Sequence, residues 1–208
     1  MKQLDFSFFD AKYIIGVIEA TGYSSTHYAL AELVDNSIQS GMEGPSKKCD
    51  VDIIVIEKGG LISKILVFDN AQGMNPNKLR ESLIIGRGQA LEDTKKNRRG
   101  LGKASKYGAG LKQASISQCN RTEVFTWQDN KIFKSYIDTV DLKAGKYNEV
   151  PLPKESKIPE EYLKLFSFKT KSHGTLVTWE DMKSRISWKT AAGLFRNAEM
   201  ELGRIYRY

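Results

Sequence analysis

The stretch from residue 26 to 41 has the spacing of an amphipathic helix. Its apolar positions recur every three or four residues and form one stripe: Leu30, Leu33, Val34 and Ile38. Glu32 and Asn36 are four residues apart on a common face, roughly opposite the stripe, with Asp35 beside them. The pattern therefore predicts a helix that presents an acid and an amide together, either to solvent or to a ligand.

Strand-like runs on either side of short turns predict two β-hairpins, and a further run predicts a single strand. The expected strands are residues 51–57 with 61–69, 122–128 with 131–138, and 174–180. Helical spacing, caps and breakers predict helices at 10–20, 26–41 (opened by a Ser24/Ser25 cap), 75–85, 111–119 and 188–207. Residues 141–172 show no clear pattern apart from a helical one at 159–166. Hairpin strands with segregated helices indicate an α+β sandwich rather than a parallel doubly wound sheet.

Length and composition favour one domain over residues 1–208. With 40% hydrophobic residues the chain can bury a core, and 27% of its residues are charged. No apolar run approaches the roughly 18 residues of a spanning helix, and the N-terminus lacks the pattern of a signal peptide. Two distant cysteines and two histidines argue against a zinc site. We expect a reduced, cytoplasmic protein without a membrane contact.

The positive charge is concentrated in one glycine-rich segment. The net charge is +7, and residues 95–112 alone carry seven lysines and arginines without an acid. A solvated basic loop, a nucleic-acid patch and a phosphate-binding segment all fit this composition. The glycines favour phosphate because they let backbone N–H groups approach an anion. A loop as long as 86–107 is typical of a functional lid.

Two familiar phosphate motifs fail in this segment. "RRGLGKAS" (98–105) is preceded by Asn97 where a P-loop needs glycine, and it has Ala104 where a P-loop needs serine or threonine. "GRGQAL" and "GAGLKQ" each lack the third glycine of a dinucleotide fingerprint. Neither motif therefore explains the glycines and lysines of this segment.

Four short motifs occur one after another along the chain, each on a particular predicted element. Glu32 and Asn36 stand on one helix, "DNAQGM" (69–74) ends a strand, "YGAGLK" (107–112) ends the basic segment, and "GT" (174–175) opens a strand. This set resembles the ATPase superfamily of gyrase, heat-shock chaperone, histidine kinases and MutL (GHKL), with the strongest likeness to its microrchidia-like (MORC-like) and bacterial relatives. The resemblance covers about residues 28–180. It implies a two-layer α/β sandwich of the Bergerat type, with a mixed, mostly antiparallel sheet, helices on one face and an ATP lid at about 86–110.

The resemblance implies a role for each matched residue at the phosphate end. Glu32 matches the general base that activates water, and Asn36 matches the ligand of Mg, a cation that prefers hard oxygen atoms. Gly108 and Gly110 match the lid glycines that pack against the phosphates. Three lysines are candidates for a phosphate contact, without a ranking among them: Lys103, Lys106 and Lys112.

At the base end, Asp69 matches the residue that accepts from the adenine amino group. An ionised carboxylate only accepts, so it discriminates against guanine. Gly73 and Met74 would make room for and flank the base, and Thr175 would support it. The family pattern D-x-G-x-G has Ala71 at its first glycine, which puts tight nucleotide binding in question if that position needs a positive φ. Taken singly, each of these residues also has an ordinary structural explanation.

Two functions stay open at this stage. One is a Mg-dependent ATPase module that binds ATP and ADP, hydrolyses ATP slowly, and forms a homodimer on ATP binding in a longer protein. The other is a nucleotide-dependent module that binds DNA or a partner through the basic segment. A histidine-kinase domain is a weaker third, because such domains lack a dedicated base at the position of Glu32. The chain stops at Tyr208, soon after the last motif, so we expect an N-terminal part of a longer protein.

Overall fold

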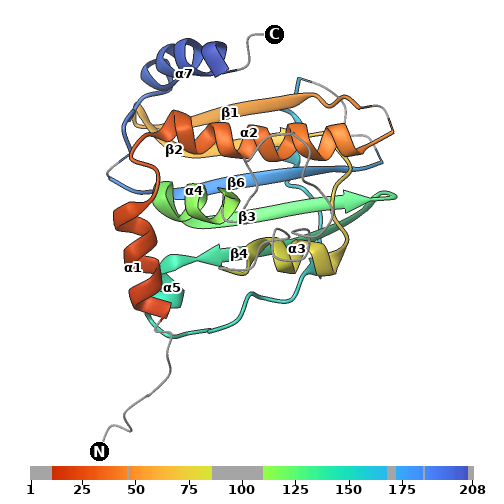
Figure 1. Cartoon of the computed structure of the whole chain (residues 1–208), viewed down its shortest axis with the longest axis horizontal. Helices are drawn as coiled ribbons and strands as arrows, with labels where there is room; N and C mark the ends of the chain where they lie inside the picture. Colours follow the sequence, from red (N-terminus) through yellow and green to blue (C-terminus); the bar gives the residue numbers. More distant parts are fainter. Residues whose placement is uncertain (1–10, 46, 86–109, 168–171, 185, 206–208) are drawn as a thin grey trace, which may run out of the picture.

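The fold is a six-stranded antiparallel sheet with its longer helices on one face. The computed structural model describes residues 11–45, 47–85, 110–167, 172–184 and 186–205. The strands are β1 (Val51–Lys58), β2 (Leu61–Asp69), β3 (Cys119–Gln128), β4 (Lys131–Asp138), β5 (Lys154–Glu155) and β6 (Gly174–Met182). Their order in the sheet is β1-β2-β6-β3-β4-β5, with β6 central (Figure 1).

Both predicted hairpins form, and each turns through two residues of positive φ. Gly59 and Gly60 have φ of 62° and 77° between β1 and β2. Asp129 and Asn130 have φ of 50° and 62° between β3 and β4. Two-residue turns of this kind match the right-handed twist of paired strands, and glycine, aspartate and asparagine tolerate them best. The turn chemistry thus sets where both hairpins reverse, and in the first hairpin an irregularity between Ile56 and Glu57 shifts the register once.

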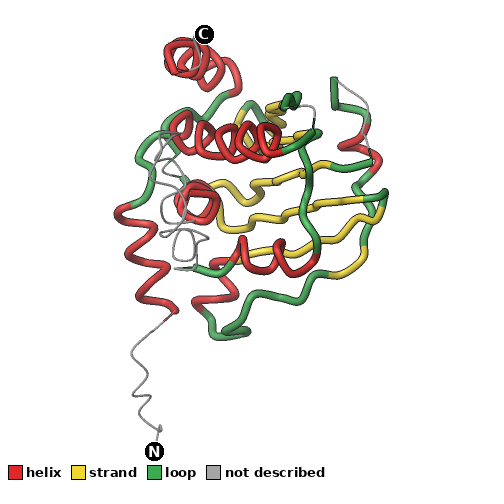
Figure 2. Tube along the Cα trace, turned by 45° about the vertical axis from the view of Figure 1, so that its right-hand side comes forward, coloured by secondary structure: helices red, strands yellow, loops and turns green. Residues whose placement is uncertain are grey.

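Seven helices occur in the described residues. They are α1 (Ala11–Thr21), α2 (Thr26–Glu43), α3 (Pro76–Leu83), α4 (Gly110–Gln118), α5 (Thr139–Lys143), α6 (Glu160–Leu163) and α7 (Ala191–Ile205). Helices α1 to α4 cover one face of the sheet (Figure 2), and the larger core lies between the two layers. Leu30 of α2, Ile116 of α4 and Trp179 of β6 are almost completely buried there. The predicted sandwich is confirmed.

A smaller core lies on the opposite face of the sheet. Phe68 and Trp127 stack with ring centroids 5.9 Å apart, and Phe166 stacks on Phe68 at 3.9 Å. Ile158 and Tyr162, from the segment around α6, bury themselves in the same cluster. The helix predicted at 159–166 exists as the four-residue α6, and it lies on the face away from the long helices.

Some local predictions need correction. Ile38 is 38% exposed, so the buried stripe of α2 runs from Leu30 and Leu33 to Ser37 instead. Ser25 is the N-cap residue of α2, but its hydroxyl bonds the ring of His27 at 2.6 Å rather than capping the helix.

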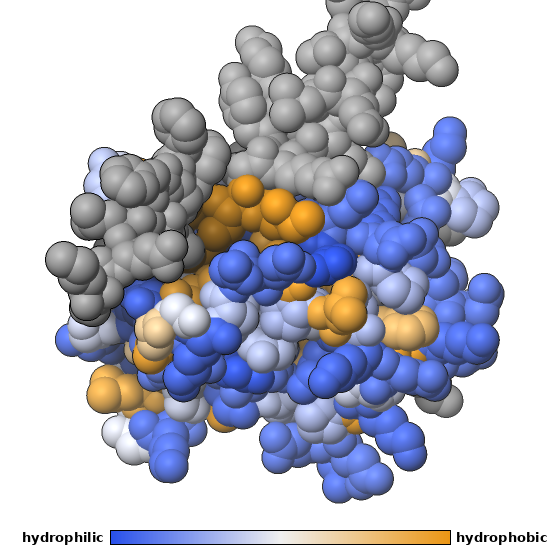
Figure 3. All heavy atoms as spheres, turned by 90° about the horizontal axis from the view of Figure 1, so that it is seen from below, coloured by the Kyte–Doolittle hydropathy of each residue, from blue (hydrophilic) through white to orange (hydrophobic). Residues whose placement is uncertain are grey.

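The surface seen from below is mostly hydrophilic and shows one larger apolar patch (Figure 3). In the described ranges, no helix has the length and apolarity needed to cross a bilayer.

Candidate active site

The sheet and α2 bring two of the predicted base-binding residues together. Asp69 ends β2, Thr175 lies near the start of β6, and the two are direct partners across the antiparallel pair. Asp69 is only 6% exposed although it carries a carboxyl group. A carboxylate this deep needs hydrogen-bond donors around it, because an unpaired buried charge is costly.

Those donors come from α2 and from the turn after β2. The hydroxyl of Ser37 donates to Oδ2 of Asp69 at 2.8 Å, and the backbone N–H of Ala71 donates to Oδ1 at 3.0 Å. Burial nevertheless dominates and raises the pKa of Asp69 to about 6. With a pKa near 6 the carboxyl group is mostly ionised at neutral pH, and the hydrogen bonds from Ser37 and Ala71 hold it in one orientation.

The turn after Asp69 depends on a glycine. Gly73 has φ of 64°, and a Cβ there would overlap the carbonyl oxygens of Trp127 and Gly174. Only glycine combines this φ with such close packing. Met74, the next residue, is held by β3, because the hydroxyl of Thr126 accepts from the N–H of Met74 at 2.7 Å. The turn is thus built against the ends of β3 and β6.

The alanine that replaces the family's first glycine is accommodated. Ala71 is not among the described residues with positive φ, so its methyl group imposes no backbone strain. It is buried, and its carbonyl lies 2.5 Å from Nδ1 of His173. Asn70, beside it, is structural: its amide donates to Asp50 at 2.7 Å and ties the end of β2 to the residue before β1. The departure from D-x-G-x-G therefore leaves the turn intact.

The second group of predicted residues lies at the start of α4. Glu32 is half-buried and Asn36 is exposed, one turn apart on α2. Gly110, the first residue of α4, lies so close that a Cβ there would overlap Oε2 of Glu32 and stand 3.9 Å from the amide nitrogen of Asn36. The glycine lets the N-terminal turn of α4 approach both side chains. A helix N-terminus favours anions, since its first N–H groups lack partners in the helix.

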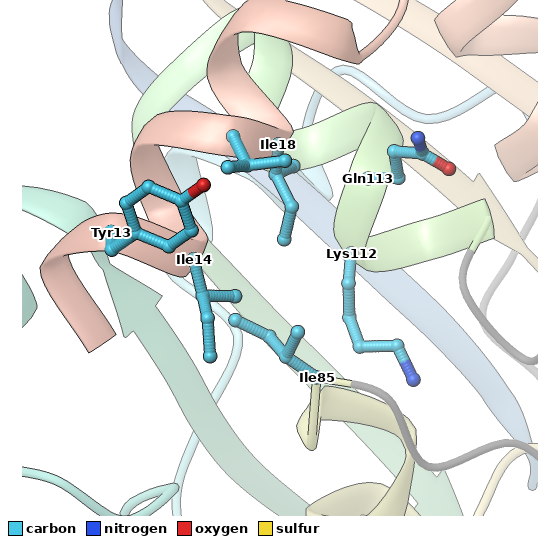
Figure 4. A pocket seen from close by; sticks show the side chains of 7 residues that line it. Tyr13, Ile14, Ile18, Ile85, Lys112 and Gln113 are labelled. Atoms are coloured by element: carbon cyan, nitrogen blue, oxygen red, sulfur yellow. The ribbon is translucent and has the colours of Figure 1, made fainter. Parts of the chain in front are cut away.

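Lys112 lies in a different environment. It is only 3% exposed and lines a pocket of about 340 Å³ with Tyr13, Ile14 and Ile85, among others (Figure 4). Burial lowers the pKa of Lys112 to about 8. Its side chain extends from α4 past Ile85, which lies just after α3 (Figure 4). The remaining predictions, Lys103, Lys106 and Gly108, lie outside the described residues.

Two residues of the site were missed from the sequence. Ser37 and Thr126 hold the base end through hydrogen bonds. Ser37 had a signal, since it falls at helical spacing after Leu30 and Leu33 in the apolar stripe. A polar residue inside such a stripe is usually buried with a partner.

Comparison with known proteins agrees with this geometry. The family model described as "Histidine kinase-, DNA gyrase B-, and HSP90-like ATPase" matches residues 23–175, which is most of the chain. The chain belongs to this ATPase family. It is also similar to Protein MICRORCHIDIA 5 of Arabidopsis thaliana, with 32% identity over 97 residues. That match covers 47% of this chain and 13% of the plant protein, so the chain spans a small part of its relative.

Family membership confirms the resemblance found in the motifs and implies ATP binding and hydrolysis. ATPases of this family generally bind ATP with Mg. The donor set fits such a cation, because Asn36 offers a neutral, hard oxygen on an exposed face beside the acidic Glu32 and Asp35.

Proposed function

We propose that the domain binds ATP with Mg between β2, α2 and α4, and that it hydrolyses ATP slowly with Glu32 as general base. The observation that carries this proposal is the arrangement along α2. Ser37 bonds the buried Asp69, while its neighbour Asn36 and, one turn before that, Glu32 lie beside the first residue of α4. One helix thereby connects a base-reading carboxylate to a phosphate-binding helix end.

At the base end, the ionised Asp69 would accept from the adenine amino group. Thr175 would support the same edge, directly or through water. Its hydroxyl lies 3.3 Å from that of Thr126, which also accepts from the N–H of Met74. Gly73 supplies the turn, and Met74 an apolar wall for the base. Guanine presents a carbonyl oxygen where adenine has its amino group. That oxygen and the carboxylate of Asp69 are both acceptors, so they would repel each other.

At the phosphate end, the N-terminal turn of α4 would receive the phosphates, with Gly108 and Gly110 allowing close approach. Asn36 would hold the Mg ion, which would neutralise charge on the phosphate oxygens. Glu32 would orient a water and take its proton during attack on the γ-phosphate. Lys103, Lys106 and Lys112 remain candidates for a phosphate contact.

The proposal is tested by calorimetry and phosphate release on the whole 208-residue chain. We expect Mg-dependent ATP binding that is stronger than GTP binding, and slow release of phosphate. Asn36→Ala should weaken binding only in the presence of Mg, whereas Gln39→Ala, an exposed change on the same helix, should leave binding unchanged. If ATP and GTP bind equally well and without regard to Mg, the proposed site is wrong.

We also propose that ATP binding switches a larger protein, through closure of the segment 86–110 and formation of a homodimer. The family resemblance supports this step. Sedimentation with and without a non-hydrolysable ATP analogue tests it in a chain that includes any following domain. The expected result is a dimer that depends on nucleotide.

The basic segment favours a second candidate, a module that contacts DNA when nucleotide is bound. Seven cations without an acid in residues 95–112 would supply the phosphate contacts. DNA binding measured over a salt series with and without ATP distinguishes the two. Tight, strongly salt-dependent binding in a Glu32→Ala variant would make hydrolysis incidental to DNA binding.

A further inference from the structure

His173 directly precedes the Gly174–Thr175 pair that opens β6, and its side chain contacts the turn after β2. The ring nitrogen Nδ1 lies 2.5 Å from the backbone carbonyl oxygen of Ala71. Because a carbonyl oxygen can only accept, Nδ1 carries the proton and donates, which fixes the tautomer of the neutral ring. The hydrogen bond therefore joins a partly buried histidine to the turn that follows Asp69.

The two residues that follow His173 meet the same turn. A Cβ on Gly174 would lie only 2.5 Å from the backbone oxygen of Asp69, and Thr175 is the direct partner of Asp69 across the antiparallel pair. A Cβ on Gly73 would in return lie 2.9 Å from the carbonyl oxygen of Gly174. The start of β6 and the turn after β2 are thus closely packed, and this packing places His173 beside the turn.

Ala71 connects the histidine to the proposed base-reading carboxylate. Its N–H donates to Oδ1 of Asp69 at 3.0 Å, and its carbonyl oxygen accepts from His173. Ala71 is only 3% exposed, and buried backbone groups need such partners. Since Ser37 donates to Oδ2 at 2.8 Å, the orientation of the carboxylate depends on where Ser37 and Ala71 lie.

The end of the turn is held independently of the histidine. The N–H of Met74 donates to the hydroxyl of Thr126 at 2.7 Å, and that hydroxyl donates to the carbonyl of Gly174 at 3.1 Å. In the described part of the chain, only His173 donates to Ala71. Loss of the histidine's donor should therefore loosen Ala71 and leave the end of the turn in place.

We propose that His173 is a positioning residue for adenine recognition, which holds Ala71 so that its N–H keeps the carboxylate of Asp69 oriented toward the base. This inference rests on the proposed base-reading role of Asp69. A binding loop that is already held in its bound conformation loses less entropy when the ligand arrives, so the contact strengthens adenine binding. It does not help guanine, whose carbonyl oxygen meets the same carboxylate as a second acceptor.

The test compares His173→Leu with His173→Asn. The two new side chains branch alike, but only asparagine can donate from a nitrogen bonded to Cγ, as Nδ1 of histidine is. Calorimetry with Mg should show ATP binding about fivefold weaker in His173→Leu, the effect of one lost neutral hydrogen bond. In His173→Asn, ATP binding should stay within about twofold of the wild type. GTP binding and the melting temperature should hardly change in either variant.

The ratio of ATP to GTP affinity separates positioning from packing. A merely structural histidine would weaken both nucleotides alike, whereas positioning of Asp69 lowers this ratio in His173→Leu alone. Adding His173→Leu to Asp69→Asn should leave the ratio unchanged, because the carboxylate through which His173 acts is gone. His27→Leu is the control: this histidine contacts Ser25, ten residues before Ser37 and so about 15 Å away along α2, and its loss should leave the ratio unchanged.

The tautomer of His173 provides a test without substitution, because nitrogen NMR should find the proton of the neutral ring on Nδ1. A proton on Nε2 instead, wild-type ATP binding in His173→Leu, equal losses in the leucine and asparagine variants, or equal losses for ATP and GTP would each overturn the proposal. Failure of the proposed function looks different, because the wild-type protein itself would then bind ATP and GTP equally well.

Discussion

The two ends of the proposed site are built in different ways. At the base end, Asp69 is buried in the sheet, held by Ser37, and followed by a turn that only Gly73 permits. At the phosphate end, Glu32 is half-buried and Asn36 is exposed, and both stand on the surface of one helix. The base end is thus part of the core, whereas the phosphate end consists of side chains on the surface of a helix. Changes at the base end should cost stability or affinity, whereas changes at the phosphate end should cost turnover or Mg-dependent binding and leave stability unchanged.

The largest effect is expected for Glu32→Ala. Loss of a general base typically lowers a rate by about 100-fold to 10,000-fold, so turnover should nearly vanish. Since the side chain is not part of the core, ATP affinity should remain within a few-fold and the melting temperature should hardly move. Phosphate release, calorimetry and a thermal melt on the same samples check this, with Gln39→Ala as the control. Magnesium-dependent turnover that survives in Glu32→Ala would reduce Glu32 to a surface carboxylate.

Gly73→Ala tests the base end of the site, where we expect a loss of stability. The change imposes positive φ on alanine and a clash with two backbone carbonyls, so we expect a loss of about 3 kcal/mol in the free energy of unfolding. Gly59→Ala is the matched control, because Gly59 has φ of 62° but nothing within 4 Å of the added carbon.

The control should therefore cost only about 1 kcal/mol, the strain of the left-handed backbone by itself. Denaturant unfolding of the two variants measures the difference. Equal losses would mean that the turn after Asp69 yields to the extra methyl group, and that the base end is less rigid than its packing indicates.

The sequence predicted the elements that have a long period or strong turn chemistry. Both hairpins were found because two strand-like runs, rich in β-branched or aromatic residues, flank a two-residue turn in each. The five-residue α5 and the two-residue β5 were missed, since neither is long enough to show a period. Their stability comes from neighbours, such as the side chain of Asp138 that caps α5.

The parts of the candidate site that depend on local spacing in the sequence were predictable. The parts that depend on how helices pack against the sheet were not. The pair Glu32 and Asn36 could be placed on one helix face by spacing alone. Ser37 reaches Asp69 only because α2 crosses the end of β2, a relation that no local pattern contains. The burial of Lys112, two residues after Gly110, likewise depends on how α4 packs against its neighbours.

Asp69→Asn should remove most of the preference for adenine. An asparagine can present either an acceptor or a donor, so it no longer penalises guanine, and the charge-assisted hydrogen bond is lost. Such a bond contributes roughly 1.5–3 kcal/mol, which corresponds to about tenfold to a hundredfold in ATP affinity. Calorimetry with ATP and GTP measures both effects. Unchanged ATP binding in Asp69→Asn would take Asp69 out of the base-reading role.

The smallest effect is a pH dependence of nucleotide affinity that arises from Asp69. Its pKa of about 6 lies above the ordinary value of 3.8, so the carboxyl begins to take up a proton as the pH falls through 6. The adenine amino group donates best to the ionised form, so binding should be strongest above pH 6 and weaken below it. Between pH 7.5 and 5, ADP affinity should fall about threefold to tenfold more in the wild type than in Asp69→Asn. Protonation of ADP itself is common to both proteins and cancels in this ratio. A ratio that stays constant over this range would show that the proton on Asp69 does not compete with the base.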